Sequence, residues 1–216
     1  MSTYGKNVRI YAHRGLWGGV KNYQNTYEAI KDALDNNFLV ETDIRDHFSE
    51  IVISHDFATG DDLPYKNFLK LVEQYPHLTG HAINVKSDGL ADNIIGLGSY
   101  TNLFFFDMSS PQMDIYKKKN IPFLSRLSDF ETQPLLHEIA VGYWVDSFSL
   151  QGFETNLVNL KSLPIKNNTI FVSPELHGFE HEFFWEALIK LIDSSPCGHI
   201  GICTDLPFEA NKFFNS

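Results

Sequence analysis

The sequence predicts an α/β fold, a small (β/α)8 barrel, and two observations support this prediction. Eight short apolar runs that resemble β-strands recur along the 216 residues, and helical or turn-rich segments follow several of them. Alternation of strands and helices is typical of a parallel sheet, and eight such units suit a closed barrel. No change in composition indicates a linker, so we expect a single domain over residues 1–216. An open, doubly wound sheet is the alternative arrangement.

The candidate strands are short runs rich in β-branched and aromatic residues. They cover residues 8–13, 38–44, 81–86, 102–107, 121–125, 142–148, 169–175 and 199–205. Apolar periodicity and capping residues predict helices over 25–37, 109–120, 181–195 and 206–214. The weaker segment 87–101 contains three glycines. An extra run, IVISHD at 51–56, follows the second strand after a polar stretch, and predicts a short hairpin insertion there.

Two carboxylates lie on one face of the second strand. Alternation along FLVETDI places Glu41 and Asp43 together on the face that points into the barrel. Inward carboxylates two residues apart repel each other and are poorly hydrated, so such a pair either has a raised pKa or binds a cation. A hard divalent ion such as Mg²⁺ or Ca²⁺ prefers oxygen ligands. The alternative is that both carboxylates are solvated and paired with basic side chains.

Other polar residues follow the ends of neighbouring strands. Asn84 and Lys86 share one face of the third strand, His13 and Arg14 end the first, and His55 ends the insertion. Strand ends at the carboxyl face carry the catalytic groups of barrel enzymes. Two histidines can act as general acid and base, while arginine and lysine can bind phosphate oxygens. Each residue alone is more often structural, but their conjunction favours an active site.

Charge and hydropathy limit the possible partners. The formal net charge of −10 disfavours a nucleic-acid partner and stable attachment to an anionic membrane. No apolar run reaches the about 18 residues of a membrane-spanning helix, and the N-terminus has no run typical of a signal peptide. We therefore expect a cytoplasmic protein. A small anionic substrate would need a local cluster of cations.

Four motifs in order resemble those of one enzyme family. AHRG at 12–15, QNTYEAIKDAL at 24–34, VETDI at 40–44 and IVISHD at 51–56 are similar to the opening of glycerophosphodiester phosphodiesterases. Weaker likenesses follow at INVK and at TDLP, residues 204–207. The close resemblance covers residues 8–56. It implies a (β/α)8 barrel and hydrolysis of a small phosphodiester.

The resemblance also implies roles for individual residues. His13 and His55 match the general acid/base pair of the family, Arg14 and Lys86 match phosphate-binding residues, and the divalent-cation ligands correspond to Glu41, Asp43 and Asn84. Nothing in the residues decides whether water or a neighbouring substrate hydroxyl attacks phosphorus.

Two departures from the family pattern weaken this implication. The third cation ligand is usually acidic but is Asn84 here, and the Glu of the family's Glu-Asn-Thr motif is Gln24. Loss of one carboxylate should lower metal affinity. The departures leave three alternatives: a non-catalytic barrel that binds a phosphodiester or phosphosugar, a lyase acting on phospholipid head groups, and a purely structural role for the polar residues.

Overall fold

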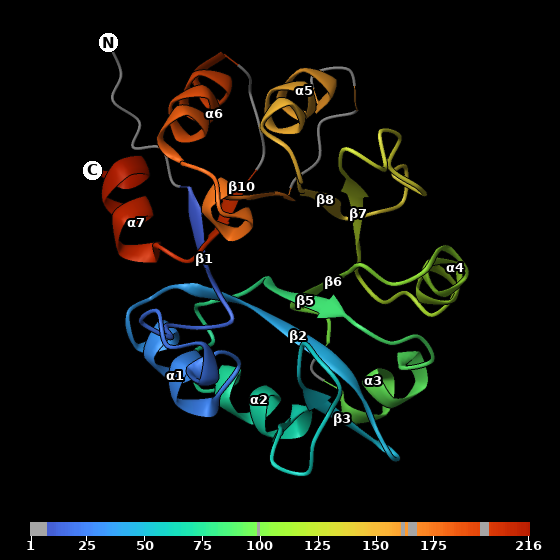
Figure 1. The fold of residues 1–216 in the computed structure, drawn as a ribbon. Coiled ribbons are helices and arrows are strands. Elements are labelled where there is room, and N and C mark those ends of the chain that lie inside the picture. The colour runs from blue at the N-terminus through green and yellow to red at the C-terminus, as the bar shows by residue number, and fades with distance from the viewer. Residues whose placement is uncertain (1–7, 99, 161–162, 164–167, 195–198) are drawn as a thin grey trace. The chain divides into compact units, whose positions relative to one another are not determined.

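The computed structural model describes residues 8–98, 100–160, 163, 168–194 and 199–216. The chain divides into two compact units. The N-terminal unit is Tyr11–Phe123, and the C-terminal unit is Leu124–Ser216 together with Met1–Ile10. The elements of each unit are labelled in Figure 1.

The N-terminal unit is built on four parallel strands flanked by an antiparallel insertion. Neighbouring parallel strands follow the order β1, β2, β5, β6. Their bounds are Arg9–His13, Leu39–His47, His81–Val85 and Leu103–Phe106. Antiparallel β3 (Glu50–Ile53) pairs with β2 and with β4 (Leu63–Pro64), which confirms the predicted hairpin insertion.

Helices cover this sheet. They are η1 (Lys21–Tyr23), α1 (Tyr27–Asp35), α2 (Tyr65–Val72), α3 (Ala91–Leu97) and α4 (Ser110–Lys118). Thr26 caps the start of α1, since its hydroxyl accepts a hydrogen bond from the Ala29 N–H at 3.2 Å. Its apolar face is buried, and Figure 1 shows α1 beside α2 below β2. Helix α2 was not predicted from the sequence.

The C-terminal unit contains the other four predicted parallel strands, in the order β7, β8, β9, β10. Their bounds are Leu124–Leu127, Gly142–Val145, Asn168–Val172 and His199–Thr204. Its helices are α5 (Leu150–Leu160), η2 (Pro174–His177), α6 (Glu182–Ser194) and α7 (Pro207–Asn215). Helix α5 was also not predicted, and residues 128–141, all of which the structure describes, join β7 to β8 without a helix.

The mixed α/β class and the parallel pairing of the eight predicted strands are confirmed. Strand β2 is central to the N-terminal unit, and its residues 39–44 are all buried. Such continuous burial is expected of a parallel strand covered on both faces. It means that the two acidic residues of β2, Glu41 and Asp43, are buried carboxylates. No helix within the described ranges is long and apolar enough to cross a membrane.

Candidate functional site

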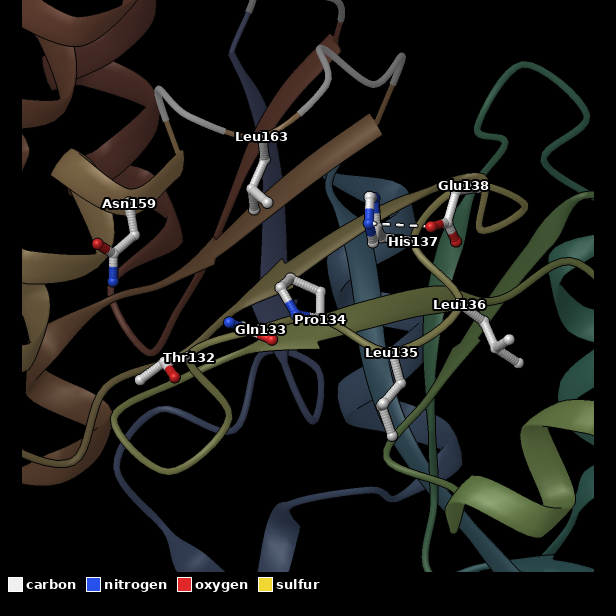
Figure 2. A pocket seen from close by; sticks show the side chains of 9 residues that line it. All are labelled: Thr132, Gln133, Pro134, Leu135, Leu136, His137, Glu138, Asn159 and Leu163. Carbon is white, nitrogen blue, oxygen red and sulfur yellow. Dashed lines mark ion pairs between the residues drawn. The ribbon is translucent and has the colours of Figure 1, made fainter.

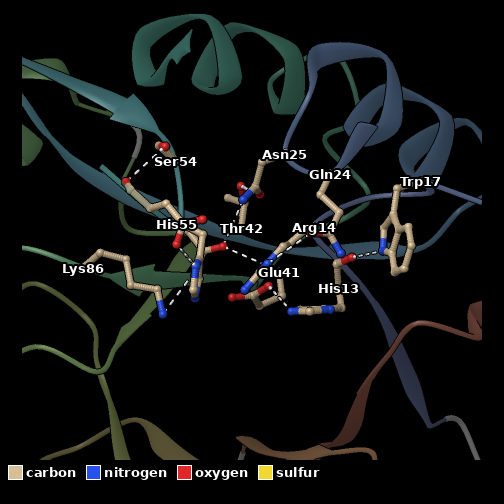
Figure 3. Close-up of polar contacts among 12 residues, drawn as sticks. His13, Arg14, Trp17, Gln24, Asn25, Glu41, Thr42, Ser54, His55 and Lys86 are labelled. Atoms are coloured by element: carbon tan, nitrogen blue, oxygen red, sulfur yellow. Dashed lines mark hydrogen bonds and ion pairs between the residues drawn. The ribbon is translucent and has the colours of Figure 1, made fainter. Parts of the chain in front are cut away.

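The predicted site residues gather within the N-terminal unit. The register places His13 of β1 opposite Glu41 of β2, and Asp43 of β2 opposite Asn84 of β5. Figure 3 shows the side chains of His13, Arg14 and Lys86 converging on the region of Glu41. Each of these residues lies on a strand or directly after one, so their relative positions are set by the parallel register.

The turn after β1 directs Arg14 toward this region. Arg14 and Gly15 both have positive φ, of 58° and 86°. A Cβ atom on Gly15 would lie only 2.5 Å from the carbonyl carbon of Ala29, so the turn packs against α1 in a way that glycine alone allows. The Arg14 carbonyl accepts a hydrogen bond from the Asn25 N–H at 2.9 Å, which holds the loop closed. The strained backbone is thus fixed by contacts on both sides.

Asp43 is the centre of the polar contacts. The guanidinium Nε of Arg14 lies 3.0 Å from Oδ2 of Asp43, and Nζ of Lys86 lies 3.4 Å from Oδ1. The Asn25 amide donates a third contact to Oδ2 at 2.9 Å. Asp43 is fully buried. Both cations predicted to bind phosphate are therefore paired with this carboxylate.

Glu41 is buried without comparable partners. It is 2% exposed, and its Oε2 accepts no hydrogen bond from the described residues. The imidazole of His13 lies beside it, with Nε2 4.0 Å from Oε2 of Glu41. Burial, and then the negative charge of Asp43, raise the pKa of Glu41 to about 7. The direction agrees with the expectation that two inward carboxylates either raise a pKa or bind a cation.

His55 lies on the insertion side of the site. The Ser54 N–H donates to the carbonyl of Asp43 at 3.0 Å, which ties the end of β3 to β2 beside the buried carboxylates. Nδ1 of His55 lies 2.9 Å from Oδ1 of Asp56. In the view of Figure 3, His55 and His13 lie on opposite sides of Glu41. The ring of His55 remains partly exposed and accessible to a ligand.

A cavity of about 570 Å³ adjoins this region. Arg14 and His55 belong to its lining, together with residues of the 21–28 and 54–64 segments, whereas His13 does not. The cavity therefore extends from the predicted site toward the insertion.

A second cavity, of about 560 Å³, lies in the C-terminal unit (Figure 2). Thr132–Glu138 with Asn159 and Leu163 line it, and its ion pair is between His137 and Glu138 at 3.2 Å. It contains none of the predicted site residues.

Three buried oxygen atoms fit the predicted cation. Oε2 of Glu41, Oδ1 of Asp43 and Oδ1 of Asn84 accept no hydrogen bond from the described residues. An all-oxygen set of this kind suits Mg²⁺ or Ca²⁺. Among the described residues no three or more His, Cys, Asp or Glu side chains are placed to hold a metal. A three-ligand cation site here therefore needs the amide oxygen of Asn84 in addition to the two carboxylates.

Two residues that contact Asp43 or Arg14 were missed as parts of the site. Asn25 enters the sequence analysis only as the first residue of the predicted helix over 25–37, but its side-chain amide contacts both Asp43 and the hydroxyl of Thr42. Gln24 was noted as a departure, and its Oε1 accepts a hydrogen bond from Nη1 of Arg14 at 3.1 Å. Their adjacency in the QNT motif is the signal that could have identified both.

No family model matches the sequence, and the search of curated proteins found no match. Solved structures do match. A candidate glycerophosphodiester phosphodiesterase from Galdieria sulphuraria is 14% identical, with a TM-score of 0.71 over 99% of this chain and 100% of that one. A glycerophosphodiester phosphodiesterase from Parabacteroides distasonis is 18% identical, with a TM-score of 0.65 over 97% and 98%. These matches confirm the motif resemblance at the level of the fold. They agree with the predicted (β/α)8 barrel.

Proposed function

We propose that this protein is a phosphoric diester hydrolase that cleaves a small glycerophosphodiester-like substrate. One observation carries the proposal: His13, Arg14, Glu41, Asp43, His55 and Lys86 come together at the ends of neighbouring strands in one unit. The fold shared with glycerophosphodiester phosphodiesterases supports it. A structural role alone does not require two histidines beside two buried carboxylates and two cations.

Arg14 and Lys86 bind the substrate phosphate in the proposed reaction. In the free protein both cations contact Asp43. The anionic oxygens of a diester offer them a second acceptor, and the arginine fork suits two phosphate oxygens. Because Gln24 is neutral, its contact with Arg14 leaves the charge of the guanidinium uncompensated on that side. The proposed reaction requires the bound phosphorus to lie between the two histidines.

The two histidines move the protons. One imidazole takes a proton from the attacking hydroxyl, either of water or of the substrate itself, as the new P–O bond forms. The other donates a proton to the leaving oxygen as the old P–O bond breaks. Asp56 holds the ring of His55 through Nδ1, which leaves Nε2 for this exchange.

Glu41, Asp43 and Asn84 would hold a divalent cation. When bound, such an ion supplies positive charge that offsets the charge on the phosphoryl oxygens. The two carboxylates and the amide of these residues disfavour softer metals, which prefer sulfur or imidazole ligands. Since only two of the three ligands carry charge, we propose weak binding that substrate phosphate strengthens.

The first test is turnover of bis(p-nitrophenyl) phosphate with added Mg²⁺, Ca²⁺ or Mn²⁺. We expect activity in the unmodified protein and at least a hundredfold loss in His13→Ala and His55→Ala, the usual scale for a lost acid or base. His77→Ala is the matched control, since this exposed histidine contacts Asn37 instead. Equal activity in all four proteins would contradict the proposed roles.

A non-catalytic phosphodiester-binding protein is the second candidate, and Asn84 with Gln24 favours it. Both positions carry an amide where the related pattern has a carboxylate. A panel of glycerophosphodiesters, assayed for turnover and for binding with and without metal, separates the two. Binding without turnover supports the second candidate. The single domain, the cytoplasmic location and the absence of a nucleic-acid partner stay predictions.

A further inference from the structure

Arg45 continues the face of β2 that carries the two buried carboxylates. Alternation along the strand places Glu41, Asp43 and Arg45 on one face. Arg45 is partly buried and pairs in register with Val52 of β3, at the base of the insertion. Positions two residues apart on a strand are about 7 Å apart. The backbone of Arg45 is therefore close to Asp43, which pairs with both proposed phosphate-binding cations.

The charge of Arg45 is not matched by an ion pair. Arg14 and Lys86 both lie within 4 Å of an Asp43 oxygen, whereas no carboxylate in the described part of the chain lies that close to the side chain of Arg45. Its recorded contact is with an aromatic ring: Cζ lies 5.5 Å from the centroid of Phe57. None of its five donors forms a hydrogen bond with the described residues, so they are available to a ligand.

Phe57 places this guanidinium on the His55 side of the site. The residue follows His55 and Asp56 directly in the chain, and its ring is 92% exposed. A ring this exposed buries little apolar surface, and the guanidinium of Arg45 lies over it. The charges of Arg14 and Arg45 both help to lower the pKa of Asp56, after the larger effect of His55. The two guanidinium groups therefore act on the same small region.

We propose that Arg45, held against Phe57, binds a second anionic group on the substrate, so that the preferred diester carries a carboxylate or phosphate on its alcohol arm. The proposal rests on the proposed phosphodiesterase function. Arg14 and Lys86 bind the diester phosphate itself, and Arg45 binds the anionic group on the alcohol arm. A spacer of two or three carbons covers the step from position 43 to position 45.

The net negative charge of the protein supports the assignment of Arg45 to an anionic group. At a net charge of −10 the protein repels anions, so an anionic arm is favoured only by a local cation. The planar guanidinium can bind a carboxylate through two parallel hydrogen bonds, which an ammonium cannot do. Lysine at this position should therefore be only a partial replacement.

The test compares two synthetic p-nitrophenyl phosphodiesters that differ in the second arm, 2-carboxyethyl or 3-hydroxypropyl. We expect the unmodified protein to prefer the carboxylate arm in kcat/KM, and Arg45→Gln to lower that preference about tenfold. Arg45→Lys should lie between the two. Lys66→Gln, which removes an exposed cation paired with Glu50, is the matched control and should keep the preference. An unchanged preference in Arg45→Gln overturns the proposal.

A binding measurement separates this proposal from the proposed function. Dissociation constants of the same two diesters are measured by calorimetry in the unmodified protein and in Arg45→Gln. If neither diester is turned over but the carboxylate arm binds about tenfold more tightly only when Arg45 is present, the hydrolase assignment fails and the anion site stands. If the unmodified protein binds both arms equally, or prefers the hydroxyl, the anion site is excluded.

Discussion

The side-chain amide of Asn25 connects the two faces of β2 through one residue. Its Nδ2 donates to Oδ2 of Asp43 at 2.9 Å, and its Oδ1 accepts from the Thr42 hydroxyl at 2.7 Å. Asn25 has a φ of 60° and directly precedes the cap of α1. The start of that helix and the orientation of a buried carboxylate are therefore coupled.

Replacement of Asn25 should disturb both structure and activity. Asn25→Ala leaves the buried Thr42 hydroxyl and one Asp43 oxygen without this partner, which should cost about 2 kcal/mol of unfolding free energy. Activity should fall as well, because Asp43 loses a group that orients it. Urea unfolding and kcat/KM measure the two effects, and the exposed Asn102→Ala serves as control. Equal stability of the two variants would contradict the coupling.

Glu41 should lower stability at neutral and alkaline pH. Its pKa is raised to about 7 in the folded protein, from an ordinary value of 4.5. Below about pH 4.5 the carboxyl is protonated in both states. As pH rises toward 7 the unfolded chain loses the proton first, so stability falls, by on the order of 3 kcal/mol at most.

Glu41→Gln should therefore be more stable than the unmodified protein at pH 8 and differ little in electrostatic energy at pH 4. Its catalytic activity should be lost if the carboxylate holds a cation. Chemical denaturation at the two pH values checks the first point. A variant that is less stable at pH 8 than the unmodified protein would show that the buried carboxylate is better compensated than its contacts indicate.

Asn84→Asp should strengthen cation binding. The substitution restores a third charged oxygen ligand opposite Asp43, and oxygen sites gain affinity with ligand charge. We expect at least a tenfold lower Kd for Ca²⁺ or Mg²⁺ by calorimetry. Asn93→Asp adds the same charge on an exposed helix position and controls for net charge. If both variants bind alike, the three oxygens do not form one site.

The strands were predictable because parallel strands buried on both faces form apolar runs whose ends are polar. Helices α2 and α5 were not predicted from the sequence, and for α5 the reason is local. Helix α5 contains Gly152, a poor helix former, yet a Cβ atom there would lie 1.9 Å from a side-chain oxygen of Asp129. The side chain of Asp129 thus packs closely against the glycine that weakens the helical signal in the sequence.

The site could be predicted as a set of residues but not as a set of contacts. Alternation placed Glu41 and Asp43 on one face, and the strand ends identified the cations. That both Arg14 and Lys86 pair with Asp43, while Glu41 is left without a close partner, depends on side-chain geometry across three strands. The role of Asn25 depends on a loop with positive φ, which no periodicity reveals.

Gly15→Ala should separate steric strain from conformational strain. A Cβ atom at Gly15 meets the backbone of Ala29 at 2.5 Å, whereas one at Gly18 meets nothing within 4 Å, although both residues have positive φ. Gly18→Ala should cost about 1 kcal/mol from φ alone. Gly15→Ala should cost roughly 2–4 kcal/mol and reduce activity, because Arg14 precedes it. Similar unfolding midpoints for both variants would contradict the close packing.

His81 should make the protein less stable in acid. Its ring is 1% exposed, its Nδ1 accepts from the Val40 N–H at 3.2 Å, and burial lowers its pKa to about 4. The contribution to stability is complete above about pH 6.5. It is lost as pH falls toward 4, because the unfolded chain takes up the proton first.

Glu41 acts in the opposite direction between about pH 4.5 and 6.5, so the acid sensitivity of His81 is best measured in Glu41→Gln. In that background we expect urea unfolding to report up to about 3 kcal/mol less stability at pH 4.5 than at pH 7.5. Adding His81→Asn keeps an acceptor for Val40 but removes the titrating ring, so the pH dependence should largely disappear. If the double variant keeps the same slope, other groups cause it, and the buried imidazole is not the acid-sensitive part of this unit.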